Sequence, residues 1–579
     1  MKKGLLYTIL LGAACLMSVS CSDFLDEKNK VDIDKNKFMN SPEQAESVLL
    51  GVYQSGISDG MYSMNLSFYL SMGTDCEQVE GNSTESWRIV PTNAYPTTQA
   101  EIQRTWQALY KGIYYANDFI ERLSAKIDGF SEKNKPVSTI YLAEARALRA
   151  MYYFELVRRF GNIPLFISTE MSYMHPSEMT QEDPVKVYEF IEQDLLYAID
   201  NLPYATEDQY RKDNKFRFSK GAAQGLLAKV YATWAGYPLN DTSKWEKAAI
   251  VAGNLIDSKK HSLLPDFVDL WKNTCNGVWN PQESLIEISF YSPTTTGAAS
   301  DPCGRIGKWN GAKTSAIAGL RGSCAGNVKV VHSFVLKWRN EDGVDATNPE
   351  GTIGMLDVRR DISVANYRYT DPTEDNPTGY QLLARGSKDS EEVGKENDLD
   401  PDKRQKEKQT YTPAKWDIQK YGEGSNALIN NDKSNVNWYV LRYADVLLIY
   451  AEALNEWKNG PTAEAYDAIN TVRRRAYGNP SNTVACDIPT GLSKEDFRQA
   501  VRDERSYELA FEGHRRLDLV RWGIYFETIQ NTYYDLMAWW SDATYKVYEY
   551  TEKGKHELLP IPQREMDLCT KFEQNPGWK

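Results

Sequence analysis

The residues best suited to nucleophilic chemistry lie in GISDG, residues 56–60, which has the spacing of a G-x-S-x-G nucleophile elbow. That motif needs a strand before the serine, whereas a helical pattern precedes Gly56, so we interpret Gly56 as a helix stop. The zinc pattern H-E-x-x-H and the phosphate-binding pattern G-x-x-x-x-G-K-[ST] do not occur in the sequence. The 5 histidines are widely spaced. We therefore expect no histidine metal site and no catalytic residue.

Two acidic segments have part of the spacing of a calcium-binding loop. One runs from Asp398 to Asp402 and has Lys403 where that loop needs glycine; the other begins at Asp32 and has Lys37 there. We expect solvated acidic loops, with no metal and no cofactor. A carboxylate pair for glycoside hydrolysis is recognised by its separation in space, and nothing singles one out among 80 acidic residues.

The composition restricts the class of ligand. The chain has 67 basic and 80 acidic side chains, a net charge of −13 and no basic block, which argues against nucleic acid as a partner. Aromatic residues make up 12% of the chain, including 36 Tyr and 15 Trp, more than a core of this size needs. We expect some of these rings on the surface, where they recognise flat apolar faces such as sugar rings or peptide side chains.

The first residues have the pattern of an export signal. Lys2 and Lys3 precede an apolar run over residues 5–17, and small or polar residues lead to Cys21. This pattern predicts a signal peptide of residues 1–20, too short to span a bilayer. A cysteine after small residues is typical of a bacterial lipobox, so we interpret Cys21 as the lipidated first residue of the mature chain. Ordinary cleavage, with Cys21 incidental, is the alternative.

Apart from Cys15 and Cys21, the chain has six cysteines, which are widely and irregularly spaced. They are Cys76, Cys275, Cys303, Cys324, Cys486 and Cys569. No C-x-x-C pair occurs, so neither a zinc site nor a tight disulfide framework is indicated. We expect free thiols, with a disulfide between Cys303 and Cys324 as the alternative in an exported protein.

Hydrophobic periodicity predicts a mainly α fold in three regions. Helices are predicted in the region 21–257 at residues 41–56, 106–120, 140–160, from 184, 219–235 and 245–256. Region 258–437 is rich in Gly, Asn, Ser, Thr and Pro, with short ordered elements at 283–291 and 328–338 and a charged surface loop at 389–408. Region 438–579 returns to helices at 438–457, 463–476 and 493–511. We expect tetratricopeptide-like helix pairs as the scaffold, with a large irregular loop-rich insertion that binds the ligand.

The block ERSYELAFEGHRRLDLVRW, residues 504–522, places many charges around an apolar stripe. A catalytic cluster is one interpretation. We favour a paired network that locks helices together, because opposite charges at helical spacing usually have that role.

Eight segments, in order along nearly the whole chain, resemble the SusD/RagB family of Bacteroidetes outer-membrane lipoproteins. They are CSDFLDEK at 21–28, WQALYKGIYYANDFIERL at 106–123, AEARALRAMYYFELVRRFGNIPL at 143–165, FSKGAAQGLLAKVYA at 218–232, LRYADVLLIYAEALNE at 441–456, ERSYELAFEGHRRLDLVRWG at 504–523, LLPIPQREM at 558–566 and QNPGW at 574–578. The resemblance implies a protein without enzymatic activity that caps a SusC-like TonB-dependent transporter in the outer membrane and closes over a captured ligand.

The resemblance leaves the ligand open between two classes. Many family members bind glycans, and some RagB-like members serve peptide uptake. We expect an oligosaccharide or polysaccharide, with a peptide as the alternative on the same scaffold. A surface glycoside hydrolase is a third and weaker hypothesis.

Two loop regions correspond to the family's ligand-contacting loops. The first, residues 73–95, contains Asp75, Trp87, Asn93 and Tyr95, of which Asp75 stands where the family often has an acidic residue. The second, residues 291–323, contains Trp309, Asn310, Lys313 and Arg321. A Trp face stacks on the apolar face of a pyranose, and polar side chains bond its hydroxyls.

Trp87 and Trp309 are the strongest of these candidates because polar, glycine-bearing sequence surrounds them, although burial in the core is the alternative for any one Trp. By contrast, Trp106, Trp438 and Trp522 lie on helical stripes and are predicted to be core residues.

The predicted anchor can be tested by replacing Cys21. We expect Cys21→Ala to abolish incorporation of radiolabelled fatty acid and to release the protein from the membrane fraction, because acyl chains supply the membrane affinity. A wild-type chain that takes up no acyl label and stays on the membrane would contradict the lipoprotein interpretation.

Overall fold

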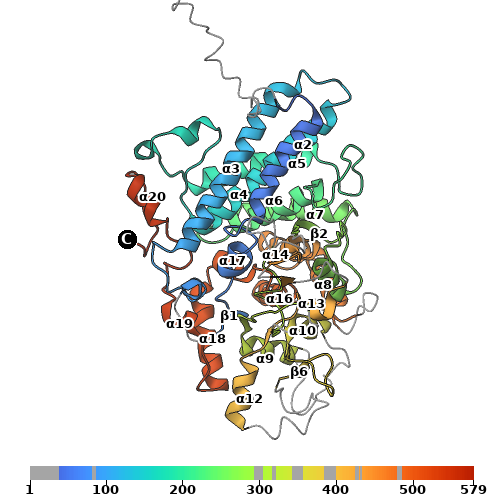
Figure 1. Ribbon diagram of the computed structural model, residues 1–579, viewed down its shortest axis with the longest axis vertical. Coiled ribbons are helices and arrows are strands. Elements are labelled where there is room, and N and C mark those ends of the chain that lie inside the picture. Colours follow the sequence, from blue (N-terminus) through green and yellow to red (C-terminus); the bar gives the residue numbers. More distant parts are fainter. Residues whose placement is uncertain are drawn as a thin grey trace, which may run out of the picture.

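The computed structural model describes residues 38–80, 86–291, 304–315, 321–341, 357–383, 400–423, 429–430, 433–478 and 486–579. The predicted signal peptide, Cys21, Cys303, Asp32 and Asp398 lie outside these residues. The described part is mainly helical, as predicted, with a few short strands (Figure 1). None of its helices combines the length and apolar character needed to cross a membrane.

Six long helices form the N-terminal part, at the positions the periodicity predicted. They are α2 (Pro42–Gln54), α3 (Ala100–Ile127), α4 (Lys135–Phe160), α5 (Pro184–Asn201), α6 (Lys220–Trp234) and α7 (Lys244–Asp257). Side chains of Ser41, Asp183 and Ser219 cap three of them by accepting backbone N–H bonds in the first turn. At the other end of α4, Gly161 has a φ of +67°, which stops the helix where the sequence predicted.

The central region contains short elements joined by irregular chain. They are α8 (Phe267–Asn276), β2 (Ser284–Ile288), β3 (Val328–Val330), α9 (His332–Glu341), α10 (Val358–Ser363), β4 (Val364–Ala365), β5 (Tyr367–Tyr369), β6 (Tyr380–Leu382), α12 (Pro401–Lys408), β7 (Thr412–Pro413), α13 (Ile418–Tyr421), β8 (Ile429–Asn430) and β9 (Lys433–Ser434). The prediction of a loop at 389–408 is wrong over α12. Asp400 accepts the N–H of Asp402 and Pro401 occupies the first turn, so local capping starts a helix despite the high charge.

The C-terminal part returns to helices after one strand. Its elements are β10 (Trp438–Arg442), α14 (Tyr443–Trp457), α15 (Ala463–Ala476), α16 (Lys494–Glu508), α17 (Arg515–Arg521), α18 (Tyr525–Trp539), α19 (Lys546–Tyr550) and α20 (Gln563–Leu568). The predicted helix 438–457 is wrong over its first five residues, which pair antiparallel with β2. All five are buried, and a short buried run has no periodicity that separates strand from helix.

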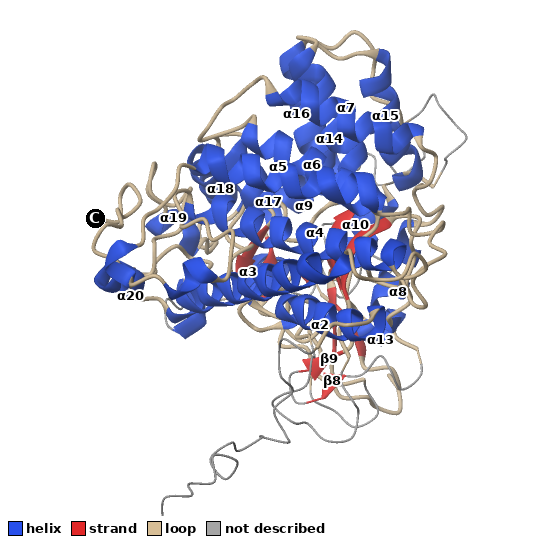
Figure 2. Ribbon diagram, turned by 90° about the horizontal axis from the view of Figure 1, so that it is seen from above, coloured by secondary structure: helices blue, strands red, loops and turns tan. Residues whose placement is uncertain are grey.

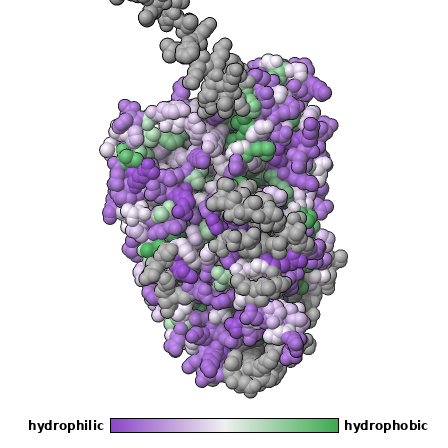
Figure 3. All heavy atoms as spheres, viewed as in Figure 1, coloured by the Kyte–Doolittle hydropathy of each residue, from purple (hydrophilic) through white to green (hydrophobic). Residues whose placement is uncertain are grey.

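In the N-terminal part, helices that follow one another in the chain also pack on one another. Each of α2 to α6 packs against the next helix, and α14 packs against α6 and α7, so the C-terminal helices extend the N-terminal array (Figure 2). The antiparallel pairing of β1 (Glu77–Val79) with β3 links the N-terminal region to the central region. One main core therefore draws on all three regions. Outside it, the face seen in Figure 3 is mostly hydrophilic, with apolar residues scattered over it.

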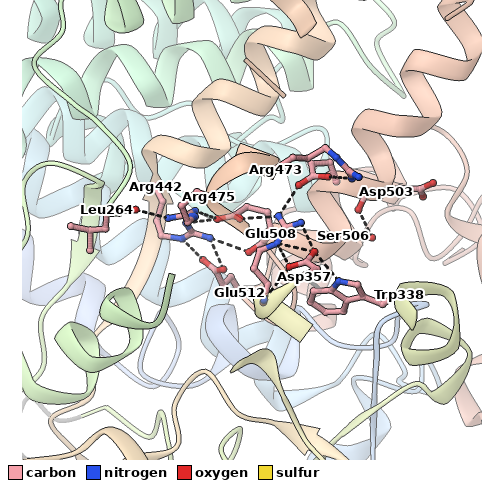
Figure 4. Close-up of polar contacts among 12 residues, drawn as sticks. Leu264, Trp338, Asp357, Arg442, Arg473, Arg475, Asp503, Ser506, Glu508 and Glu512 are labelled. Carbon is pink, nitrogen blue, oxygen red and sulfur yellow. Dashed lines mark hydrogen bonds and ion pairs between the residues drawn. The ribbon is translucent and has the colours of Figure 1, made fainter. Parts of the chain in front are cut away.

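A buried ion network joins the central and C-terminal regions (Figure 4). Its centre is Arg442 on β10, which lies 2.9 Å from Glu283, 2.9 Å from Glu508 and 2.7 Å from Glu512. The side chains of these residues are 0–1% exposed. The charged block is thus a paired structural network, as predicted, because its carboxylates face guanidinium groups in the interior.

Further cations complete the network around Glu508. Arg475 lies 2.7 Å and Arg359 3.0 Å from its carboxylate, and Lys415 lies 2.7 Å from Glu512. Burial alone would raise the pKa of Glu508, but Arg475, Arg442 and Arg359 hold that pKa well below its usual range. The carboxylate therefore stays ionised in the interior.

Arg442→Met should lower the free energy of unfolding by about 3–5 kcal/mol, because it leaves buried carboxylates without their counter-charge. Lys135→Met is the control, since it removes an exposed ion pair with Glu132 at 2.7 Å and should leave the free energy of unfolding almost unchanged, because water screens that pair. Chemical denaturation followed by circular dichroism measures both. Equal midpoints for the two variants would show that the network does not stabilise the fold.

Candidate ligand-binding site

Four aromatic side chains from separate segments meet in one cluster, which we call the aromatic cluster: Phe68, Tyr69, Trp87 and Trp309. Tyr69 stacks on Trp87 with ring centroids 5.0 Å apart, and Trp309 meets Trp87 edge-on at 6.0 Å. Phe68 lies 5.3 Å from Trp87 and 6.2 Å from Trp309. The two tryptophans, which are far apart in the chain, therefore lie side by side, and both are only partly buried.

Short helical turns position the first three rings. Phe68 and Tyr69 are buried and end the single π-helical turn Asn65–Tyr69, and Trp87 lies in the 3₁₀ turn Ser86–Ile89. The guanidinium of Arg88 lies over the Trp87 ring, 4.7 Å from its centroid. Tyr69 and Arg88 together fix the orientation of Trp87 and place a hydrogen-bond donor beside it.

The segment that carries Trp309 is held by an ion pair to the N-terminal region. Arg305 lies 3.0 Å from Asp59, and its carbonyl accepts the N–H of Trp309 at 3.3 Å. Burial would raise the pKa of Asp59, but the hydrogen bond and charge of Arg305 bring it below its usual value. Asp59 belongs to GISDG, and α2 precedes that motif as the sequence indicated. GISDG therefore anchors the Trp309 segment and is not a nucleophile elbow.

Two further candidates in this segment are engaged with the protein itself. Asn310 is buried, and its side-chain oxygen accepts the N–H of Gly307 at 2.9 Å. The backbone N–H of Arg321 donates to Gln419 at 2.9 Å. Asn310 thus shapes the chain next to Trp309, whereas the bond to Gln419 fixes the backbone of Arg321.

Asn93 and Tyr95 were expected to contact the ligand, but both side chains are buried. Asn93 is 2% exposed and donates to Tyr525 at 2.9 Å and to Thr551 at 2.8 Å. Tyr95 is 4% exposed and stacks on Trp578 with centroids 5.2 Å apart. Both side chains bind the first loop to the C-terminal segments, because those segments fold back over it.

Asp75 lies apart from the aromatic cluster. It forms an ion pair with Arg515 at 2.6 Å and lines a cavity of about 800 Å³ whose walls include no member of the cluster. Burial would raise the pKa of Asp75, but Arg515 lowers it below its usual value. Asp75 is therefore a fixed anion that joins the first loop to α17.

The structure offers little for metal chemistry. Within the described residues, no group of three or more His, Cys, Asp or Glu side chains could hold a metal ion. Cys76, Cys275, Cys324, Cys486 and Cys569 are buried free thiols, as predicted.

Sequence reasoning missed Phe68, Tyr69 and Arg88. The apolar segment SFYL is typical of core, and Phe68 and Tyr69 are indeed buried while they also support Trp87. Arg88 directly follows Trp87 in the sequence, and this position could have indicated that its guanidinium lies near the ring.

Two family models match the chain. The model described as "SusD family" matches residues 260–578, and the model described as "Starch-binding associating with outer membrane" matches residues 23–232. The chain belongs to the SusD family.

Solved structures of SusD relatives share this fold. A SusD homolog from Bacteroides thetaiotaomicron VPI-5482 is 61% identical, with a TM-score of 0.87 over 95% of this chain and 100% of that one. A laminarin-binding SusD-like protein is 25% identical, with a TM-score of 0.65 over 92% of this chain and 99% of that one. Among curated relatives, SusD-like protein P25 of Formosa agariphila is 24% identical over 563 residues, 95% of this chain and 94% of its own length.

Proposed function

We propose that this protein captures a nutrient glycan at the cell surface and delivers it to a SusC-like TonB-dependent transporter. The observation that carries the proposal is the aromatic cluster, in which Trp87 and Trp309 converge on a SusD-family fold. The loops that resemble the family's ligand loops supply these two rings.

The cluster has the chemistry that a pyranose requires. Partly exposed indole rings cover the apolar C–H face of a sugar, and each such contact removes apolar surface from water. The guanidinium of Arg88, 4.7 Å from the Trp87 ring centroid, supplies donors for sugar hydroxyls. Aromatic surface with a nearby fork of N–H donors therefore suits a glycan.

A glycan is favoured over a peptide because related proteins are described by their glycans. One structural relative, 25% identical, is named a laminarin-binding SusD-like protein, and one family model carries the description "Starch-binding". A peptide-binding lid remains the second candidate, since aromatic rings also receive apolar peptide side chains.

The site supports binding without catalysis. Glycoside hydrolysis needs one carboxylic acid with a raised pKa beside a second carboxylate. Asp59, which anchors the Trp309 segment, is instead ion-paired with Arg305, and its pKa is lowered. Asp59 therefore does not have the raised pKa that the proton donor of such an enzyme needs.

The proposed location is the exterior face of the outer membrane, through a lipid on Cys21. Two observations support it: the lipobox pattern around Cys21 and the family description "associating with outer membrane".

Glycan binding is tested with the full chain in detergent and a panel of laminarin, starch and peptides. We expect a glycan to bind, and Trp87→Ala or Trp309→Ala to raise its dissociation constant roughly thirtyfold, about 2 kcal/mol for a central ring. Titration calorimetry and melting temperature are measured together. Tyr173→Ala, which removes a ring that is 77% exposed and outside the aromatic cluster, is the control and should change neither. Peptide binding in place of glycan binding, or unchanged affinity in both Trp variants, would contradict the proposal.

The proposed transporter is tested by gentle detergent extraction from the native membrane. We expect an outer-membrane barrel of the SusC class to be recovered with this protein, because a lid must stay on the pore that it serves. Identification is by mass spectrometry, with a Cys21→Ala strain as the control for membrane attachment. Recovery of the protein alone under several mild conditions would argue against a stable complex.

A further inference from the structure

A second cavity, of about 560 Å³, has no residue of the aromatic cluster in its walls. Its walls come from β1, β3, α12 and the segment after α18. α12 is the yellow-orange helix at the lower end of Figure 1. The volume is within the range of small-molecule sites in proteins.

One wall holds a buried cation with spare hydrogen-bond donors. Lys329 on β3 faces Gln78 on β1 in the strand register, and its side chain is 5% exposed. Its ammonium lies 3.4 Å from Glu80, and within the described residues Nζ makes no hydrogen bond. Glu80 also pairs with Lys313 at 3.6 Å, so one carboxylate is shared by two ammonium groups. Because an ammonium has three donors and burial deprives them of water, Lys329 can bond an oxygen that enters the cavity.

A second buried donor lines the same cavity. The side-chain nitrogen of Gln409 is buried and likewise has no hydrogen-bond partner in the described part of the chain. Asp402 and Asp542 line the cavity as well and add acceptors. The walls therefore offer donors and acceptors together.

An aromatic ring completes the site. Trp540 lines the cavity, is only partly buried and meets Trp539 edge-on at 6.1 Å. A T-shaped contact covers at most one face of each ring, so Trp539 leaves at least one face of Trp540 uncovered.

The charges of the lining point to a neutral ligand. Three lysines, Lys329, Lys403 and Lys406, are matched by three carboxylates, Glu80, Asp402 and Asp542. A polyanion would gain little from this balance, whereas a sugar hydroxyl both accepts from lysine or glutamine and donates to a carboxylate. We infer that this cavity is a second carbohydrate-binding site, in which Trp540 stacks on a neutral sugar and Lys329 and Gln409 bond its oxygens. The inference rests on the proposed glycan binding and assigns a further site for it.

Two sites on one chain give a testable consequence for long glycans. A polysaccharide that engages both sites is held more tightly than either site alone would hold it. We expect Trp540→Ala and Lys329→Met each to weaken retention of the full chain threefold to tenfold in affinity electrophoresis on laminarin and amylopectin gels. Lys329→Met keeps the buried methylenes and leaves Glu80 paired with Lys313. Tyr534→Ala is the matched control, because Tyr534 is an exposed ring on α18 that is not in the cavity wall.

The outcomes separate this inference from the proposed function. Retention that falls for Trp309→Ala but not for Trp540→Ala and Lys329→Met would overturn the second site alone. A wild-type chain that neither gel nor any other glycan of the panel retains would overturn the proposed function, and the second site with it. Unchanged retention together with loss of the co-purified barrel in Trp540→Ala would make the cavity a protein-docking site and would also overturn the inference. Melting temperatures of the variants, expected to match the wild type, confirm that each is folded.

Discussion

The ion network around Arg442 is the interaction on which the remaining structure depends. Arg442 bonds Glu283 at the start of the central region and Glu508 and Glu512 at the end of α16 and just after it. Burying these charges is costly unless each one meets its partner, so a shift of the central region against the C-terminal helices that separated them would be unfavourable. β10 carries Arg442 and pairs with β2, which joins the same two parts through backbone hydrogen bonds. The network and the strand pair thus fix the insertion on the helical array.

Single ion pairs attach the two loops that were predicted to contact the ligand. Arg305 with Asp59 holds the Trp309 segment, and Arg515 with Asp75 holds the first loop to α17. Asn93 accepts a hydrogen bond from Arg516 at 2.8 Å while its amide donates to C-terminal hydroxyls. Several polar residues in these two loops therefore attach the loops to the rest of the fold, while Trp87 and Trp309 stay partly exposed. Rings held in fixed orientations lose little side-chain entropy when a ligand binds, which favours affinity.

The aromatic cluster and the second cavity follow one principle by different means. In the first, Trp87 and Trp309 supply aromatic surface beside the guanidinium of Arg88. In the second, one ring, Trp540, lines the same cavity as the buried ammonium of Lys329, which is ion-paired with Glu80, and the buried side-chain nitrogen of Gln409. Both combine an apolar face with directed polar groups, which is what a sugar presents in return.

The sequence by itself predicted the long N-terminal helices, α15, the family and the structural role of the charged block. These features depend on local spacing: Ser41, Asp183 and Ser219 cap helices that begin at the next residue, and residues 463–476 form α15 with the predicted bounds. Only the tertiary structure decided that residues 438–442 form a strand. Their partner is β2, and the paired residues Trp438 and Ile288 are 150 positions apart in the chain.

The same distinction divides the predicted site. Trp87 and Trp309 were singled out by their polar surroundings and do meet, whereas Asn93 and Tyr95, weaker candidates from the first loop, are covered by Tyr525 and Trp578 from the far end of the chain. Lys329 carried no signal at all, since its burial arises from strand pairing with residue 78 and not from its neighbours in the sequence. Local pattern specifies which elements form, but exposure and partnership are properties of surfaces brought together from distant parts of the chain.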